Sequence, residues 1–179
     1  MRQMFVKKFF KLSCVSTLVV FSFFSGAVQA EELTSHRVYE RVFGQPYFNE
    51  SFGPKVMMGY QRDIFLSDSF FAAFSVSGIV SGNQGGFGVV NFGFGYRTSL
   101  NSISDADIKG LAGSGGGGGV KGGSGLCFEV QSGLSLRFSP PFFLDLKIGY
   151  IKFPTGLLET PMILIGVSAV STQFSLDYR

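Results

Sequence analysis

The chain has 179 residues, 45% of them hydrophobic and 16% aromatic, and its formal net charge is +3 at pH 7. Four cations, Arg2, Lys7, Lys8 and Lys11, lie near its start, and removing their four charges from +3 leaves −1. The nearly neutral remainder lacks the excess of basic residues that proteins use to bind nucleic acid, so we expect no nucleic-acid partner.

The first thirty residues have the three parts of a secretory signal peptide. A basic start is followed by an apolar run from Leu12 to Phe24, and small Ala30 precedes Glu31. The run is shorter than the roughly twenty apolar residues that a membrane-spanning helix needs. We therefore expect residues 1–30 to be removed as a signal peptide. Residues 31–179, which number 149 (179 − 30), would then form one domain.

Beyond the signal peptide, Cys127 is the only cysteine and His36 the only histidine. A single cysteine excludes an intramolecular disulfide. A metal site gathers several ligands, which two isolated side chains do not supply. We expect neither a metal nor a cofactor.

After residue 50, apolar and polar residues alternate with the period of a β-strand that has one apolar face. Leu126, Phe128 and Val130, for example, alternate with Cys127 and Glu129. Even-numbered residues form the apolar side throughout, although the stretch just before residue 170 follows the opposite phase. The alternation predicts seven strands: residues 55–66, 70–81, 87–97, 105–112, 125–138, 142–150 and 170–178.

An up-and-down barrel of the bacterial type needs an even number of strands. Residues 33–44 alternate poorly and are compatible with a short amphipathic helix, but as a strand they supply the eighth. The predicted fold class is therefore all-β, a membrane-spanning up-and-down antiparallel β-barrel of eight strands.

The predicted connections fall into two classes. Those after the first, third, fifth and seventh strands are longer: residues 44–51, 82–86, 110–125 and 154–160. Those after the second, fourth and sixth are short: residues 67–68, 100–102 and 139–141. Long loops on one rim and tight turns on the other are typical of bacterial outer-membrane barrels, whose chain ends lie on the periplasmic, short-turn side.

The polar faces of the predicted strands carry charges of both signs, which we expect to pair inside a narrow lumen. Facing hydrocarbon, each basic group would cost about 2–4 kcal/mol near the midplane. The charged set is Lys55, Arg97, Lys109, Arg137 and Lys147 with Asp63, Asp105, Asp107, Glu129 and Asp145. Aromatic residues at the strand ends are expected to form an interfacial girdle: Phe65, Phe70, Phe71, Tyr96, Phe138, Phe142, Phe143 and Tyr178. The alternative is a soluble barrel with reversed faces, which would expose a surface of Phe, Leu and Val to water.

In these features residues 33–179 resemble the small eight-stranded outer-membrane proteins of Gram-negative bacteria. The resemblance lies in the architecture and not in a motif. It implies residence in the cell outer membrane and contact with outer-membrane lipid and lipopolysaccharide. It also implies assembly by the barrel-assembly machinery, which reads a terminal aromatic residue. Here Tyr178 stands one position early, before Arg179.

Ten of the sixteen residues from Gly110 to Gly125 are glycine. The run satisfies a dinucleotide-binding pattern through glycine content alone, and no Lys-Ser or Lys-Thr pair follows as a phosphate loop requires. We expect a flexible hairpin tip, part of which continues the flanking strands.

The residues favour a barrel without enzymatic activity, with an envelope-structural, surface-interaction or narrow-permeability role. An eight-stranded barrel leaves an interior just wide enough for side chains. The alternative is a lipid A-modifying enzyme, an acyltransferase or deacylase, because such enzymes resemble this chain in size. In that case His36 is the one candidate catalytic residue, since a serine nucleophile normally needs a histidine base.

Overall fold

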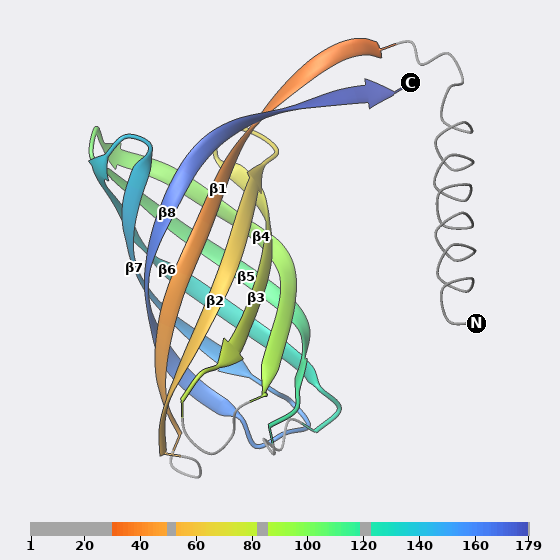
Figure 1. Cartoon of the computed structure of the whole chain (residues 1–179), viewed down its shortest axis with the longest axis vertical. Helices are drawn as coiled ribbons and strands as arrows, with labels where there is room; N and C mark the ends of the chain where they lie inside the picture. Colours follow the sequence, from red (N-terminus) through yellow and green to blue (C-terminus); the bar gives the residue numbers. More distant parts are fainter. Residues whose placement is uncertain (1–29, 50–52, 82–85, 119–122, 179) are drawn as a thin grey trace, which may run out of the picture. The chain divides into compact units, whose positions relative to one another are not determined.

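The computed structural model describes residues 30–49, 53–81, 86–118 and 123–178 of the chain. These residues form eight consecutive β-strands (Figure 1). The strands are β1 (Ala30–Asn49), β2 (Gly53–Phe65), β3 (Phe70–Ile79), β4 (Gly88–Asn101), β5 (Ser104–Gly116), β6 (Leu126–Ser139), β7 (Phe142–Lys152) and β8 (Glu159–Tyr178). The predicted signal peptide falls almost wholly on residues 1–29, outside the described residues.

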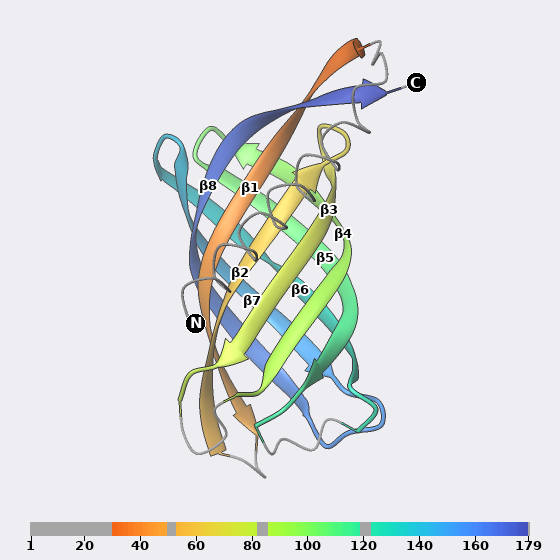
Figure 2. The ribbon, with the colours of Figure 1, turned by 45° about the vertical axis from the view of Figure 1, so that its right-hand side comes forward.

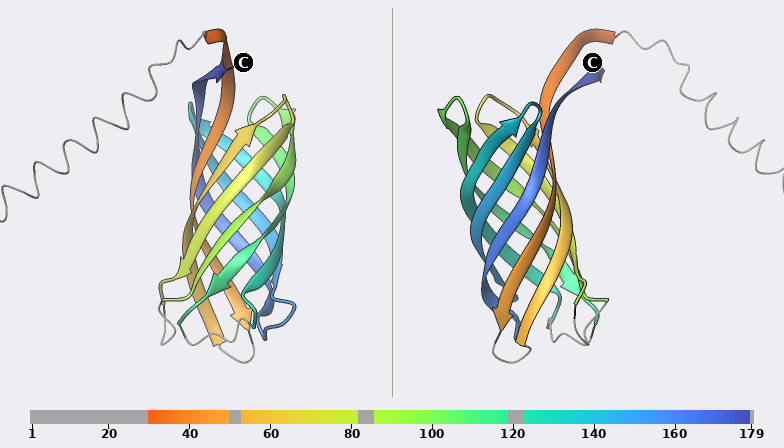
Figure 3. Two further views of the ribbon diagram at one scale, coloured as in Figure 1. Left: turned by 90° about the vertical axis from the view of Figure 1, so that its right-hand side faces the viewer. Right: turned by 60° about the vertical axis from the view of Figure 1, so that its left-hand side comes forward.

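Each strand pairs antiparallel with the next, and the sheet closes into a barrel in the order β1 to β8. The pairing is regular: Val38 faces Ile64 across β1 and β2, and Tyr60 faces Val76 across β2 and β3. Figures 2 and 3 show the strands following one another, tilted, around the closed wall. Closure leaves no unpaired edge, which is the condition for a sheet to cross a membrane. The predicted fold class is confirmed.

Residues 33–44, open between helix and strand on sequence grounds, belong to strand β1. Residues 35–173 form the barrel unit, and the described residues 30–34 and 174–178, which are the ends of β1 and β8, belong to a second unit. In the part of the chain that the structure describes, no helix is long and apolar enough to cross a membrane.

The connections confirm two unequal rims, with one exception. Residues 66–69, 102–103 and 140–141 form tight turns. On the opposite rim the strand ends are further apart in the sequence: β3 ends at Ile79 and β4 begins at Gly88, β5 ends at Gly116 and β6 begins at Leu126, and β7 ends at Lys152 and β8 begins at Glu159. The predicted loop at residues 44–51 is wrong, because β1 continues to Asn49 and β2 begins at Gly53. The glycine run is divided as expected: residues 110–116 belong to β5, and residues 117–125 connect it to β6.

The strand faces divide by parity, as the alternation predicts. Along β7, odd-numbered Phe143, Asp145 and Lys147 are buried, while even-numbered Leu146 and Ile148 are exposed. The same phase holds on β2 to β6. β8 departs from it: Ile163, Ile165 and Val167 point outward, and Val170, predicted to face lipid, packs against buried residues of the lumen. On β8 the odd-numbered apolar residues before residue 170 therefore face outward, which is the opposite phase to that of the other strands.

Candidate functional site

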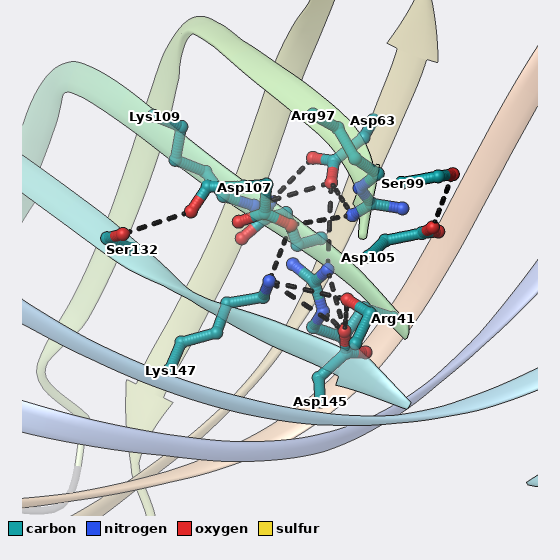
Figure 4. Close-up of polar contacts among 12 residues, drawn as sticks. Arg41, Asp63, Arg97, Ser99, Asp105, Asp107, Lys109, Ser132, Asp145 and Lys147 are labelled. Atoms are coloured by element: carbon teal, nitrogen blue, oxygen red, sulfur yellow. Dashed lines mark hydrogen bonds and ion pairs between the residues drawn. The ribbon is translucent and has the colours of Figure 1, made fainter. Parts of the chain in front are cut away.

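Charged side chains meet inside the lumen, where inward residues of β1, β2, β4, β5 and β7 converge (Figure 4). We call this group the charged belt: Arg41, Asp63, Arg97, Asp107, Lys109, Asp145 and Lys147. Every member is at most 5% exposed. Buried charges are tolerated only when they are paired and hydrogen-bonded, so the geometry of these pairs determines whether the lumen is stable.

Arg41 on β1 links carboxylates on β7 and β2. Its Nε lies 2.9 Å from Asp145 Oδ2 and its Nη2 lies 3.2 Å from Asp145 Oδ1, a two-pronged arrangement. Nη2 also lies 3.7 Å from Asp63 Oδ2. Planar guanidinium and carboxylate groups match in this geometry, which makes such pairs stronger than single contacts.

Asp63 and Asp107 each gather several cations. Asp107 Oδ2 accepts hydrogen bonds from Arg97 Nη2 at 2.8 Å and from Lys147 Nζ at 2.5 Å. Asp63 Oδ2 lies 3.3 Å from Lys109 Nζ and 3.5 Å from Arg97 Nη2. The belt is thus one continuous network, in which each carboxylate contacts at least two cations and removing any member takes a partner from at least one other charge.

Two further acids in the lumen are held by neutral donors. Asp105 accepts a hydrogen bond from Ser99 Oγ at 2.7 Å. Glu129 accepts one from Asn91 Nδ2 at 2.6 Å and another from Gln131 Nε2. These acids therefore do not depend on a cation for hydrogen bonding.

Most of the predicted lumen set is confirmed: Arg97, Lys109, Lys147, Asp63, Asp105, Asp107, Glu129 and Asp145 are all buried inside the barrel. Arg137 is a wrong prediction. It is exposed where the β6–β7 pairing shifts register, with its guanidinium 5.1 Å from the centre of the Phe143 ring. The side chain of Lys55 lies outside the described residues. Arg41 was missed, because β1 alternates too poorly to assign its faces.

Apolar side chains fill the lumen on both sides of the belt. On β7, Phe143 precedes the belt residues Asp145 and Lys147, and Ile151 follows them. The turn-end cluster contains Tyr39, Phe65, Phe71, Ala73, Leu111 and Phe143. The loop-end cluster contains Met57, Ile79, Phe87, Val89, Cys127, Ile151, Phe153, Leu158 and Met162. Apolar and charged side chains therefore share the interior.

The turn-end cluster also contacts the belt. The Arg97 guanidinium lies 4.0 Å from the centre of the Tyr39 ring, and Lys109 Nζ lies 5.5 Å from that of Phe71. Phe71 has room because Gly95 stands beside it, where a Cβ atom would come within 2.3 Å of Phe71 Cζ. Cation–π contact of this kind stabilises a desolvated cation.

The predicted aromatic girdle is correct only in part. Phe70, Tyr96, Phe138 and Phe142 are exposed on the outer wall. Phe65, Phe71 and Phe143 instead belong to the turn-end cluster, because their odd numbers place them on the inward face. The side chain of Tyr178 is not among those described.

The outer wall is apolar over most of the barrel. Ile148 is 68% exposed, Phe92 60% and Val42 59%. Soluble monomers seldom expose contiguous apolar patches larger than a few hundred square ångströms. Charged side chains inside and apolar side chains outside are the arrangement that transmembrane barrels require.

A polar patch interrupts this wall beside β1 and β2. Glu40 Oε1 lies 3.9 Å from Arg62 Nε and accepts a hydrogen bond of 3.1 Å from the Tyr60 hydroxyl. Arg62 also donates to the side-chain oxygen of Gln173. Arg62 is thus an outward charge, as its even number in the alternation predicts, and it is held by an acid on the neighbouring strand.

His36 lies near the short-turn end, next to the last residue of β2. Its Nδ1 is 3.2 Å from the carbonyl oxygen of Phe65. Among the described residues, no serine or carboxylate is recorded within hydrogen-bond distance of its ring. No group of three or more metal-ligating side chains gathers in the described part of the chain either. Cys127 is a buried free thiol with Sγ 3.1 Å from Asn91 Oδ1.

The chain is similar in fold to solved transmembrane barrels. A de novo designed transmembrane β-barrel has a TM-score of 0.51 and 14% identity, with 79% of this chain and 98% of that chain covered. The N-terminal β-barrel domain of Pseudomonas aeruginosa OprF has a TM-score of 0.52 and 16% identity, with 75% and 97% covered. The fold is that of the small eight-stranded outer-membrane β-barrels.

Neisserial surface protein A has a TM-score of 0.49 and 13% identity, with 78% of this chain and 99% of that chain covered. No protein-family model matches the chain, and no curated protein matches it. The likeness is therefore one of architecture, and function has to be argued from the residues of this chain.

Proposed function

We propose that the protein is an integral outer-membrane β-barrel with a closed lumen, which acts in envelope structure or in interactions at the cell surface. The observation that carries the proposal is the inverted distribution of polarity. The charged belt is buried, whereas the large side chains of the outer wall, such as Ile148 and Phe92, are apolar and exposed. In water this surface would be an aggregation site, while in a bilayer it meets hydrocarbon.

The packed interior argues against a diffusion pore. The turn-end cluster, the charged belt and the loop-end cluster together occupy the lumen. Interiors packed to this degree leave few voids larger than a water molecule. The barrel is then an anchor, and contact with other molecules falls to its outer wall and to the loop rim. By the rule for such barrels, the longer loops face the outside of the cell.

Fractionation tests the proposal. The protein should be recovered with outer membranes, and it should migrate differently in gels with and without boiling, because a closed barrel resists detergent until it is heated. In planar bilayers it should give no steady conductance comparable to that of a porin. Recovery as a soluble periplasmic protein would contradict the membrane assignment, and a steady open-channel current would contradict the closed lumen.

A further inference from the structure

The outer wall is hollowed near the loop rim. A groove of about 480 Å³ crosses β6, β7 and β8 and reaches β1. Its volume falls within the range of about 300–1,000 Å³ that is usual for small-molecule sites. The groove is lined by Pro46, Val130, Ser132, Ile148, Gly149, Tyr150, Pro161, Met162 and Ile163.

Differences in side-chain size form the groove. Val130, Ile148 and Ile163 stand out from the wall, at 53%, 68% and 49% exposure. Ser132 is small, and its hydroxyl is already used, since it donates to the carbonyl oxygen of Asp107 at 3.1 Å. The lining therefore offers apolar contact and little hydrogen bonding, which suits a hydrocarbon chain.

A charged pair stands at the end of the groove nearest the loops. Tyr150 lies opposite Pro161 in the β7–β8 pairing, and two residues further on Lys152 lies opposite Glu159. Lys152 Nζ and Glu159 Oε2 are 3.1 Å apart and about half exposed, at 50% and 48%. The Tyr150 hydroxyl donates to Glu159. One cation and one anion are thus presented side by side just above an apolar groove.

We infer that this groove holds one acyl chain of a phospholipid whose zwitterionic phosphoethanolamine headgroup lies over the charged pair. The phosphate matches Lys152 and the ammonium group matches Glu159, so both headgroup charges are complemented. The acyl chain then passes Tyr150 and Pro161 and lies against Ile148 and Ile163, deeper in the wall. This inference rests on the proposed function, because only a membrane-embedded wall meets acyl chains.

The test uses protein purified from the outer membrane in a mild detergent and titrated with palmitoyl lysophosphatidylethanolamine. Native mass spectrometry should show one lipid retained with saturable affinity. Ser132→Leu fills the groove with an isobutyl group and should weaken retention at least tenfold. Ala112→Leu adds the same group to an exposed position that is not among the lining residues, and it should bind as the unmodified protein does.

The headgroup assignment has its own comparison. Monopalmitoylglycerol, which has the chain but no charge, should bind several-fold more weakly than the lysophospholipid. Lys152→Gln combined with Glu159→Gln should abolish that difference. Equal retention by Ser132→Leu and Ala112→Leu would overturn the groove assignment, and a preference that survives the double substitution would overturn the headgroup assignment.

Gel mobility with and without boiling, recorded on each sample, separates this inference from the proposed function. A barrel that shifts on heating but retains no lipid overturns the lipid site alone. A chain that shows no heat-dependent mobility and fractionates as a soluble protein overturns both.

Discussion

Arg41 on β1 and Asp145 on β7 bind each other inside the lumen, over β8, through two nitrogen–oxygen contacts of 2.9 and 3.2 Å. Both side chains are almost wholly buried. Arg41→Met should therefore leave Asp145 without its main partner and lower the free energy of unfolding by about 3–5 kcal/mol, as breaking a buried pair typically does. Urea unfolding of the folded barrel in detergent or lipid vesicles measures the change.

Two further variants make the result specific to the pair. Arg137→Met removes an arginine that is exposed at a strand end, and such surface changes usually stay within about 0.5 kcal/mol. Arg41→Met combined with Asp145→Leu removes both charges and should recover much of the lost stability. If the double variant is as unstable as the sum of its single variants, the two residues are not coupled.

The architecture was predictable because a barrel strand alternates with period two, and the six segments that became β2 to β7 kept that period with one phase. Burial on one face requires a constant phase, so a pattern such as Glu129 between Phe128 and Val130 identifies both the strand and its lumen side. The loop-length alternation then ordered the strands. The strand that the sequence predicted least clearly was β1. Its outward Glu40 and inward Phe43 both oppose a simple alternation of apolar and polar faces.

The lumen was predictable in composition but not in its layers. Strand parity correctly buried Asp107 and Lys147, but parity alone gives no height along the barrel, so their contact needed the register of the strands. Prediction from strand parity and residue type also failed at strand ends. Phe143 was expected outside because aromatics are common at interfaces, yet it fills the lumen, and Arg137 was expected inside yet lies beyond the packed part. The outer groove has no sequence signal, since it depends on four strands lying side by side.

Glu129 tests whether the neutral donors of the lumen matter. Glu129→Leu removes the acceptor for Asn91 and Gln131 and buries two unpaired amides, so the free energy of unfolding should fall by about 1–3 kcal/mol. Glu129→Gln keeps a side-chain oxygen at the same place and should lose less. Urea unfolding of the two variants gives the comparison, and membrane fractionation should remain unchanged. Equal stability of the two variants would mean that these hydrogen bonds contribute nothing.

His36 separates the barrel from a lipid A-modifying enzyme. The ring nitrogen Nδ1 lies 3.2 Å from the carbonyl oxygen of Phe65, on the rim opposite the long loops. His36→Ala should therefore leave the acylation pattern of lipid A unchanged in mass spectra of whole-cell extracts. It should lower barrel stability by about 0.5–1.5 kcal/mol, the usual contribution of one hydrogen bond. Loss or gain of an acyl chain in the His36→Ala strain, at equal protein level, would establish the enzyme instead.

The glycine run should tolerate insertion only beyond the strand end. Gly117 and Gly118 have positive φ angles of 96° and 59° and lie outside β5, where backbone conformation is not fixed by sheet pairing. An epitope tag between them should be accepted and should be reached by antibody on intact cells, because loop tips accept insertions far better than paired strands do. The matched control is the same tag placed directly after Gly113. That residue is paired within the sheet, and a Cβ atom there would lie 2.0 Å from the carbonyl oxygen of Val90. The control should not assemble, as judged by heat-dependent gel mobility. If both tagged proteins fail, the run beyond Gly116 is packed structure, and if both assemble, the β4–β5 pairing at Gly113 is not needed for the barrel.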